Sequence, residues 1–458
     1  MSPSPEIKYI VLSDLHLGEM DSIFTPLDQE APELISNFST CMRSLLDWCN
    51  SSDQPCLILN GDILGLSFSN YQSSLSLFKE FVHSFGIKEN ICKEIKYIPG
   101  NHDHHIWQLA RESDFKNKLK AHRNSDNFPQ IINATKPVLT EGIPSEFFES
   151  FFHNDETNLS SIEVIYPNLI LTPKATNQPY IHITHGHFAE ETYSFVSNAM
   201  KVLYPELPPP QTIADLSYQN GAFIDFLFSM LGRSGDAGHK FDKLMSTLSS
   251  EKKLNKNIQQ LADNVALELD FPYLPFHWME KYLSKRLIAN IAEKVRSERY
   301  DASELCSDET IGGLLHYFET YCLDGMKDAD WDDQPVTFIW GHTHKPFEKY
   351  FNSNTYGEML VLNSGGYVIP FEPMPLIGAS IIFISDENEA VSLRLFNDSK
   401  NNGEMTFNIS LPENQEPTRF ANKIKSAIRN DKGELNKHWN IFKLALETEI
   451  HKRRNQDD

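Results

Sequence analysis

The sequence predicts an α/β fold that is interrupted by a large helical insertion. Three observations lead to this prediction. In the first hundred residues, short apolar runs typical of buried strands alternate with segments whose apolar residues recur every three or four positions. Similar apolar runs return at 162–184 and at 336–395. Between these two regions the sequence becomes helical and aromatic, with turn-rich breaks at 208–210 and 232–238.

The elements follow one another in a regular order. The first strand is expected at Tyr9–Leu12, and the apolar residues between 34 and 48 then predict an amphipathic helix. A second strand is expected at Cys56–Leu59, a second helix around 75–85 and a third strand at Ile95–Ile98. This succession predicts right-handed crossovers and a mainly parallel sheet. Later strands are expected at Ile162–Ile165, Tyr180–Thr184, Val336–Trp340, Met359–Leu362, Ser380–Ile384 and Val391–Leu395.

Composition excludes several classes of protein. The chain is 40% hydrophobic and 23% charged, as in globular proteins, and its net charge of −22 argues against a dedicated nucleic-acid binder. The longest apolar stretch, Gly221–Leu231, is too short to span a bilayer, and the N-terminus shows no secretory signal pattern. The six cysteines form no C-x-x-C pair, so we expect reduced thiols and a cytoplasmic protein. The basic cluster 452–454 is expected to be solvated.

Five of the expected strands are followed directly by residues of types that commonly bind metals. The segments are Asp14-Leu15-His16, Gly61-Asp62, Gly100-Asn101-His102-Asp103, His185-Gly186 and Gly341-His342-Thr343-His344. In α/β sheets, ligands bind at the carboxyl ends of the strands. Carboxylate, amide and imidazole groups suit a first-row divalent metal, and adjoining glycines allow close approach of the backbone. A single histidine at a strand end is usually structural, but five such strand ends predict a metal site.

These segments resemble the five ordered motifs of the calcineurin-like metallophosphoesterases. Asn363–Tyr367 is also similar to the strand-end sequence that often follows the last motif. The resemblance covers residues 7–187 and 335–396. It implies an αββα sandwich of two mixed sheets flanked by helices, with the helical insertion placed between the two matching parts.

The resemblance also implies a dinuclear metal site and a reaction. One divalent ion would be bound by Asp14, His16, Asp62 and His344, and the other by Asp62, Asn101, His185 and His342. Manganese is favoured over iron, zinc or magnesium. A hydroxide shared by the ions would attack a phosphate ester or anhydride, and His102 would protonate the leaving oxygen. Asp103 either orients His102 or has a structural role. His182, inside an expected strand, is interpreted as a core residue with satisfied hydrogen bonds.

The expected domains follow from these motifs. They are a first part of the metallophosphoesterase core at 1–190, the helical insertion at 191–334, a second part of the core at 335–410 and a polar helical C-terminal tail at 411–458. The insertion begins just after His185 and ends just before His342, so we expect it to form a lid or cap over the site. Its apolar clusters at 223–230 and 271–278 offer self-packing as the alternative.

The expected function is hydrolysis of a phosphorylated small molecule, lipid or protein. The alternative is a weakly active or inactive scaffold or interaction protein with the same fold, although every expected motif position is filled. Among enzymes, a protein phosphatase or a nuclease is the alternative, and the acidic balance argues against the nuclease. Ser13–Gly18 also resembles the lipid pyrophosphohydrolases, but residues 185–187 read His-Gly-His where those enzymes usually have His-Gly-Asp. The sequence specifies neither the substrate nor the oligomeric state.

Overall fold

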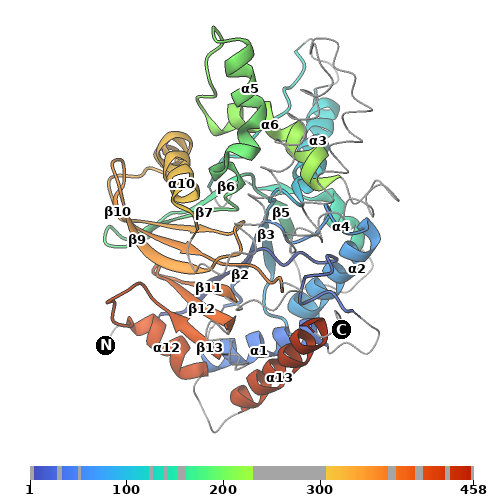
Figure 1. Ribbon diagram of the computed structural model, residues 1–458, viewed down its shortest axis with the longest axis vertical. Helices are drawn as coiled ribbons and strands as arrows, with labels where there is room; N and C mark the ends of the chain where they lie inside the picture. The colour runs from blue at the N-terminus through green and yellow to red at the C-terminus, as the bar shows by residue number, and fades with distance from the viewer. Residues whose placement is uncertain are drawn as a thin grey trace, which may run out of the picture.

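A computed structural model describes most of the chain. The described residues are 5–27, 33–49, 53–122, 127–138, 142–152, 161–230, 306–369, 378–397, 406–428 and 434–454. The fold is α/β, with two mixed sheets flanked by helices, as expected (Figure 1). Two expected features, the turn-rich segment 232–238 and the apolar cluster 271–278, lie outside the described residues.

The larger sheet has eight strands among the described residues. In spatial order they are β13 (Thr406–Ser410), β12 (Ala390–Asn397), β11 (Ala379–Ser385), β1 (Ile7–Leu12), β2 (Cys56–Asn60), β3 (Glu94–Ile98), β5 (Ser161–Val164) and β4 (Ile143–Pro144). The strands β1, β2, β3 and β5 are parallel. The outer strands are antiparallel because β11, β12 and β13 follow one another through direct returns, which a parallel arrangement does not allow.

The smaller sheet has five described strands. Their spatial order is β6 (Asn168–Leu171), β7 (Tyr180–Thr184), β8 (Val336–Trp340), β10 (Gly357–Asn363) and β9 (Phe347–Ser353). Its central strands β7, β8 and β10 are parallel, although residues 185–335 separate the first two in the sequence. The expectation of a mainly parallel sheet therefore holds only for the centre of each sheet.

The two sheets pack face to face, and alternation along the strands explains why. In β1, Val11 packs with Ile183 and Ile339 of the smaller sheet in a core between the two sheets. Its neighbours Ile10 and Leu12 point the other way, into the core beneath the helices. Because both faces of the strand are buried, it appears in the sequence as an uninterrupted apolar run.

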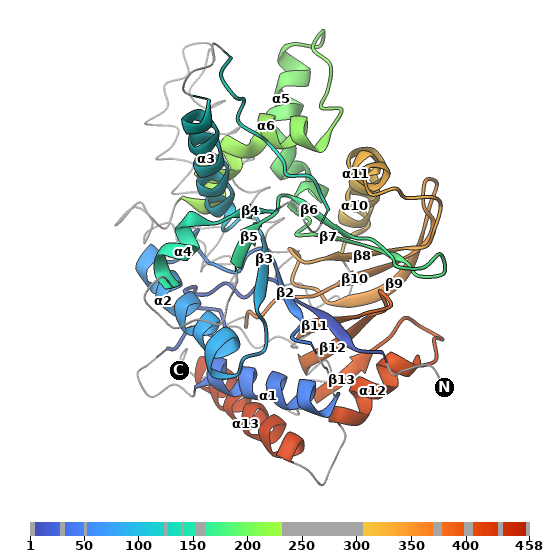
Figure 2. The same ribbon diagram turned by 180° about the vertical axis from the view of Figure 1, so that it is seen from behind.

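Helices cover the outer face of the larger sheet and its ends. They are α1 (Leu34–Trp48), α2 (Tyr71–Val82), the π-helix η1 (His83–Lys88), α3 (His104–Ala121), α4 (Glu146–Phe152), α12 (Arg419–Ile428) and α13 (Glu434–Arg454). Figures 1 and 2 show α1 and α13 side by side below the sheet, where the rings of Phe38 and Phe442 stack with centroids 5.4 Å apart. None of the described helices is long and apolar enough to cross a bilayer.

The C-terminal helix corrects one expectation from the sequence. Arg453 belongs to the basic cluster 452–454, yet its side chain is fully buried. Its guanidinium pairs with Glu449 at 2.8 Å and donates a hydrogen bond of 2.7 Å to the carbonyl of Thr25. A buried charge is stable only when paired in this way, so Arg453 helps to attach α13 to the N-terminal part of the chain.

Between β7 and β8, the described residues contain two groups of helices. The first comprises the 3₁₀-helices η2 (His187–Ala189) and η3 (Glu191–Ser194), α5 (Phe195–Leu203), α6 (Ile213–Ile224) and the π-helix η4 (Asp225–Ser229). The second comprises α10 (Asp308–Tyr321) and α11 (Leu323–Asp328). The ring of Phe318 in α10 stacks on Phe338 of β8 at 3.5 Å, so this second group covers the smaller sheet.

Candidate metal centre

The predicted site residues gather where the two sheets meet. They lie in the loops after β1, β2 and β3 of the larger sheet and after β7 and β8 of the smaller one. Backbone hydrogen bonds extend the strand pairing into these loops, since the amide of Asp14 donates to Gly61 and that of His16 to Asp62, both at 2.9 Å. The amide of Gly341 donates to the carbonyl of His185 at 3.1 Å. Neighbouring loops therefore hold their side chains at fixed positions.

Five of the predicted ligands have a left-handed backbone. The φ angles are 52° at Asp14, 48° at His16, 51° at Asp62, 70° at His342 and 59° at His344. Residues other than glycine rarely adopt this backbone conformation. Such strain is found mainly at functional sites, where the surrounding structure enforces it. The loops therefore give up local stability in order to aim these side chains into the centre.

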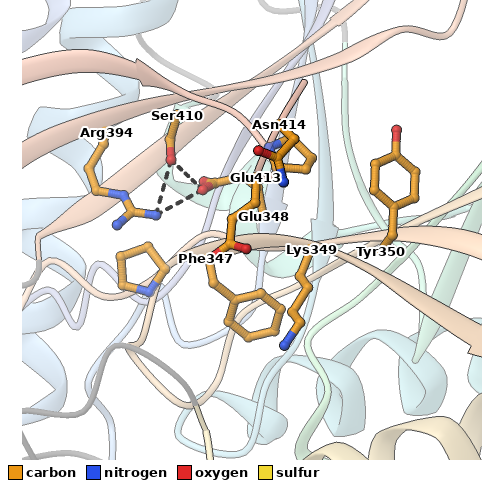
Figure 3. A pocket seen from close by; sticks show the side chains of 10 residues that line it. Phe347, Glu348, Lys349, Tyr350, Arg394, Ser410, Glu413 and Asn414 are labelled. Carbon is orange, nitrogen blue, oxygen red and sulfur yellow. Dashed lines mark hydrogen bonds and ion pairs between the residues drawn. The ribbon is translucent and has the colours of Figure 1, made fainter. Parts of the chain in front are cut away.

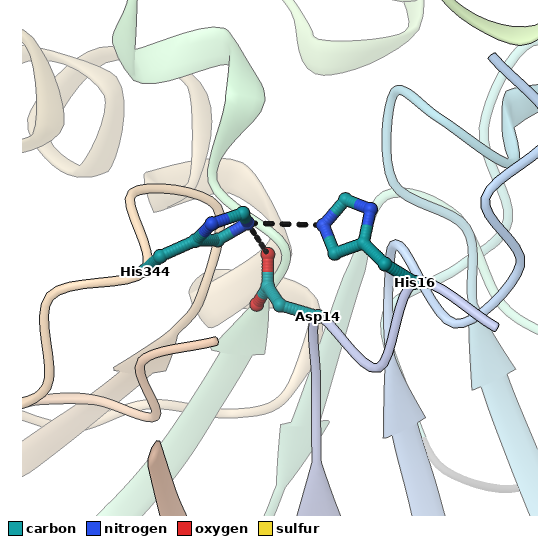
Figure 4. A group of neighbouring side chains, drawn as sticks. All are labelled: Asp14, His16 and His344. Atoms are coloured by element: carbon teal, nitrogen blue, oxygen red, sulfur yellow. Dashed lines mark hydrogen bonds and ion pairs between the residues drawn. The ribbon is translucent and has the colours of Figure 1, made fainter. Parts of the chain in front are cut away.

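The first group of donor atoms comes from Asp14, His16 and His344 (Figure 4). Nε2 of His344 lies 3.0 Å from Nε2 of His16 and 3.3 Å from a carboxylate oxygen of Asp14. All three side chains are buried. Two imidazole nitrogens and a carboxylate oxygen make up a donor set that suits a divalent first-row metal.

The second group consists of Asp62, His185 and His342. Nε2 of His185 lies 3.2 Å from Oδ2 of Asp62 and 3.2 Å from the amide oxygen of Asn101. Asp62 also faces the first group, with the same Oδ2 atom 3.9 Å from Nε2 of His16. The carboxylate of Asp62 therefore lies between the two groups, and all seven predicted ligands are brought together.

The hydrogen bonds of the histidines determine which ring nitrogens can bind a metal. Nδ1 of His185 donates to the carbonyl of Asn60 at 3.0 Å, which leaves Nε2 to face Asp62. Nε2 of His342 donates to Glu190 at 3.0 Å, and Nδ1 of His342 is buried with no hydrogen-bond partner among the described residues. Metal-binding histidines typically have their second ring nitrogen bonded to a carbonyl or carboxylate in this way. The residues present therefore fit a metal ion.

The electrostatics of the centre also suit cations. Burial alone would raise the pKa of Asp62, but His185 and His102 hold it well below its usual range. Burial would lower the pKa of His185, whereas the neighbouring carboxylates, Asp62 foremost, raise it to about 9. Charged carboxylates thus draw positive charge into a buried site, and a bound metal ion can take the place of the proton on an imidazole.

Two glycines allow the loops to approach the carboxylates closely. A Cβ atom on Gly100 would lie 2.3 Å from Oδ1 of Asp62, and one on Gly341 would lie 2.3 Å from Oδ2 of Asp14. Both distances are far inside van der Waals contact, so no larger residue fits without moving the carboxylate. At these two positions the backbone closely approaches the carboxylates of two predicted ligands.

His102 forms a third group of potential donor atoms with His16 and Asp62, and it is oriented by an unexpected residue. Its backbone amide donates to Oδ1 of Asp62 at 2.8 Å, and its Nδ1 atom lies 3.0 Å from Oε1 of Glu19. Glu19, and not Asp103, makes the orienting contact to this ring nitrogen. The position of Glu19, three residues after His16, is the signal in the sequence that was overlooked. Likewise, Glu190 comes soon after the His185-Gly186 motif.

Asp103 is engaged by the backbone around it. Its carboxylate accepts hydrogen bonds from the amides of Ile63 at 2.8 Å and Gly100 at 2.6 Å, and from the hydroxyl of Tyr97. Burial and the charge of Asp62 raise the pKa of Asp103 to about 6. These contacts connect the loop after β2 to the loop after β3, which agrees with the structural alternative for Asp103.

The histidines next to the motifs have other contacts. Nδ1 of His105 and of His104 lie 3.4 Å and 3.8 Å from Asp225 in the insertion. His187 is buried, and its Nε2 atom lies 3.2 Å from the hydroxyl of Tyr166. His104 and His105 thus connect the N-terminus of α3 to η4, whereas His187 packs beside His185.

Two cavities of about 430 Å³ each lie at the surface. One lies between η2, α5 and α10, and its lining includes Glu190, the partner of His342. The other lies between β9, β12 and the end of β13 (Figure 3). In that second cavity Arg394 pairs with Glu348 at 2.9 Å, and Ser410 bonds to the same carboxylate. The first of these two cavities therefore adjoins the candidate metal centre through Glu190.

Comparison with known proteins identifies the first part of the chain. Residues 7–216 match the model of the calcineurin-like phosphoesterase family. The matching segment contains five of the predicted ligands, whereas His342 and His344 lie beyond it and reach the same centre through the fold. No match is found among curated proteins. The geometry and the comparison together describe a metallophosphoesterase domain with buried clusters of His and Asp that can hold a metal.

Proposed function

Because residues 7–216 form a calcineurin-like phosphoesterase domain, we propose that the chain is a hydrolase that cleaves a phosphate ester or anhydride with two divalent metal ions. The observation that carries this proposal is the position of Asp62. Its carboxylate lies between two groups of buried donor atoms, at 3.2 Å from His185 and 3.9 Å from His16. A carboxylate in that position can serve both groups at once.

The proposed ligands divide into two sets. Asp14, His16, Asp62 and His344 would hold one ion, and Asp62, Asn101, His185 and His342 would hold the other. Such ions supply Lewis acidity toward phosphoryl oxygens and lower the pKa of bound water. The residues themselves exclude bulk water, because six of the seven are buried and His342 is nearly so.

His102 is the proposed general acid. Its Nδ1 atom is occupied by Glu19, so Nε2 is the nitrogen that can carry a proton to the leaving oxygen. The hydrogen bond from its backbone amide to Asp62 fixes the backbone of His102 relative to the proposed bridging carboxylate. His102 therefore lies beside the ligands with one ring nitrogen available for substrate.

We also propose that the 191–334 insertion acts as a lid. The ring of Tyr193 lies 5.1 Å from that of His342, and Phe228 packs on Tyr193 at 4.8 Å. The carbonyl of Phe228 also accepts a hydrogen bond from Ser67, in the segment after Asp62. Residues of the insertion thus lie directly against the loops that carry the proposed ligands, which is where a lid must attach.

Metal-dependent turnover tests the proposed function. The chain should be stripped of metal, reloaded separately with Mn²⁺, Zn²⁺, Fe²⁺ or Mg²⁺, and assayed with an aryl phosphate monoester and a bis-aryl diester. We expect turnover with at least one ion and its loss in Asp62→Asn, together with reduced metal content. Asp53→Asn, at an exposed carboxylate, is the control. Binding of two ions without turnover of any ester would instead support the scaffold alternative.

A further inference from the structure

A single carboxylate oxygen contacts both a proposed ligand and the proposed acid. Oε1 of Glu19 lies 3.1 Å from Nδ1 of His16 and 3.0 Å from Nδ1 of His102. Glu19 is only 2% exposed, and the two imidazole rings meet edge to face with centroids 4.8 Å apart. The three side chains therefore form one buried unit.

These contacts select the tautomer of both rings. A carboxylate only accepts hydrogen bonds, so each Nδ1 atom must carry a proton, and in a neutral ring Nε2 then has a lone pair. Nε2 of His16 faces the donor atoms of His344 and Asp62. In His102, the same arrangement directs Nε2 away from Glu19. One oxygen thus prepares His16 for metal binding and His102 for proton transfer.

The backbone opposite Glu19 is shaped to admit it. A Cβ atom on Gly65 would lie 2.2 Å from Cγ of Glu19 and 2.8 Å from its Oε1 atom. Gly65 also donates its amide to the carbonyl of Leu17 at 3.0 Å, which fixes the distance between the two loops. Only glycine at position 65 leaves room for the Glu19 side chain in this conformation.

We propose that Glu19 is a positioning residue that couples the two functions: through the same oxygen it keeps Nε2 of His16 free for a metal and makes Nε2 of His102 the nitrogen that takes up and then delivers the proton. The inference rests on the proposed hydrolase function for the role of His102. The claim about His16 depends only on metal binding by the chain and not on hydrolysis. Glu19 itself contacts neither substrate nor metal in this scheme.

The first test separates the two effects of Glu19. In Glu19→Ala we expect metal affinity to fall by about 10–100-fold, as for other residues that orient metal-binding histidines. We also expect kcat with a poor leaving group to fall at least about 10-fold more than with a good one. His102→Ala should share the leaving-group effect but keep its metal affinity. In the His102→Ala background, Glu19→Ala should weaken metal binding and add no further leaving-group effect.

The second test moves the carboxylate without removing its hydrogen-bonding partners. Gly65→Ala should displace Glu19 and reproduce both defects, whereas Gly312→Ala, a helix position whose added Cβ meets nothing within 4 Å, should reproduce neither.

Glu19→Gln keeps the shape and one acceptor oxygen, so it should retain more metal affinity than Glu19→Ala. In the double variant Glu19→Ala/Gly65→Asp, the Cβ atom of the new side chain would lie 2.8 Å from the former Oε1 position, so the new carboxylate should restore part of both properties.

The readouts distinguish the two proposals. Metal affinity is measured by calorimetric titration of the metal-free protein with Mn²⁺ or Zn²⁺, and folding is checked by circular dichroism. If Glu19→Ala and Gly65→Ala keep wild-type metal affinity and the wild-type leaving-group dependence, the role of Glu19 is refuted while the hydrolase function stands. If the wild-type chain hydrolyses no phosphoester, the hydrolase function and the part of the inference on His102 both fail. The metal titration then still decides the role of Glu19 toward His16.

Discussion

The carboxylate of Glu190 lies 3.0 Å from Nε2 of His342, and this contact connects the residue just before the insertion to a predicted metal ligand that lies just after it. It leaves Nδ1 of His342, which is buried without a hydrogen-bond partner among the described residues, as the nitrogen available to a metal. We therefore predict that Glu190→Ala lowers affinity for one of two metal ions by about 10–100-fold. Elemental analysis after dialysis against limiting metal measures this loss.

The adjacent residue provides the control for Glu190. Glu191 lines the same cavity and carries the same charge, but it is exposed. Glu191→Ala removes the same negative charge but no hydrogen bond to His342, so it should keep its metal content. Equal metal loss in the two variants would show that charge alone retains the ions.

The sequence predicted the elements of the sandwich core but not all of its edges. The strand runs at 9–12, 56–59 and 95–98 are uninterrupted because both faces are buried, so they were identified within one or two residues. The edge strand β9, Phe347–Ser353, was missed because several of its residues are exposed and polar. The short strand β6 and the strand β13 were missed as well.

Within the site, side chains in motifs were predictable and their supporting residues were not. Asp62 and His185 stand beside glycines at strand ends, a pattern visible in one dimension. Glu19 and Glu190 follow the motifs in irregular loops, so their positions close to the motifs make them candidates, but the loops have no periodicity that shows which carboxylate turns inward. For His182 the sequence predicted the burial correctly but not the hydrogen bonding. It is buried as expected, but neither ring nitrogen has a hydrogen-bond partner among the described residues.

His102 provides a prediction about the chemical step. His102→Ala should bind metal normally, because its ring is outside both proposed ligand sets. Loss of a general acid should lower kcat by about 10²–10⁴-fold with a poor leaving group and much less with a good one. A series of aryl phosphates with different leaving-group pKa values measures the difference. Loss of metal from this variant would make His102 a ligand instead.

Asp103 should be important for stability. Its carboxylate accepts hydrogen bonds from the amides of Ile63 and Gly100 and from Tyr97. An asparagine offers one acceptor oxygen, so Asp103→Asn leaves at least one buried donor unsatisfied, at a cost of about 1–3 kcal/mol. Urea denaturation should show this decrease in the free energy of unfolding, with no change in Asp53→Asn. If Asp103→Asn keeps full stability but loses activity selectively with poor leaving groups, Asp103 orients His102 instead.

His182 should make the fold sensitive to acid. Its ring packs against Phe338 at 4.9 Å, and burial lowers its pKa to about 3. The unfolded chain takes up a proton at this residue below its ordinary pKa of about 6.5, whereas the folded chain resists it. The stability associated with neutral His182 is thus present above pH 6.5 and lost as the pH falls toward 3.

The matched variant for this effect is His182→Leu, which cannot be protonated. The free energy of unfolding of His182→Leu minus that of wild type should increase by about 1.4 kcal/mol for each pH unit below 6.5. The comparison isolates His182, because the other buried histidines titrate in both proteins. Urea denaturation of both proteins at pH 7.5, 6.0 and 5.0 measures the trend. Parallel pH profiles for the two proteins would contradict the lowered pKa.

Asp225 offers a way to test the lid without removing the helices that cover the smaller sheet. Its carboxylate lies 3.4 Å from Nδ1 of His105, and the hydroxyl of Ser229 accepts a 2.9 Å hydrogen bond from the amide of the same residue. These contacts hold η4 against the start of α3. Burial opposes ionisation of Asp225, yet His104 and His105 lower its pKa. The Asp225 carboxylate is therefore ionised where it contacts these histidines, and Asp225→Ala should loosen η4.

A lid that selects substrates predicts a specific result for Asp225→Ala. Metal content should stay normal, because Asp225 lies outside both proposed ligand sets. Loosening η4 removes the support that Phe228 gives to Tyr193 over His342, so discrimination between bulky and small phosphate esters should fall by about threefold or more. The ratio of kcat/KM values measures it. Tyr218→Ala, at an exposed ring on α6, is the control. An unchanged ratio in Asp225→Ala would show that this part of the insertion packs on the core without selecting the substrate.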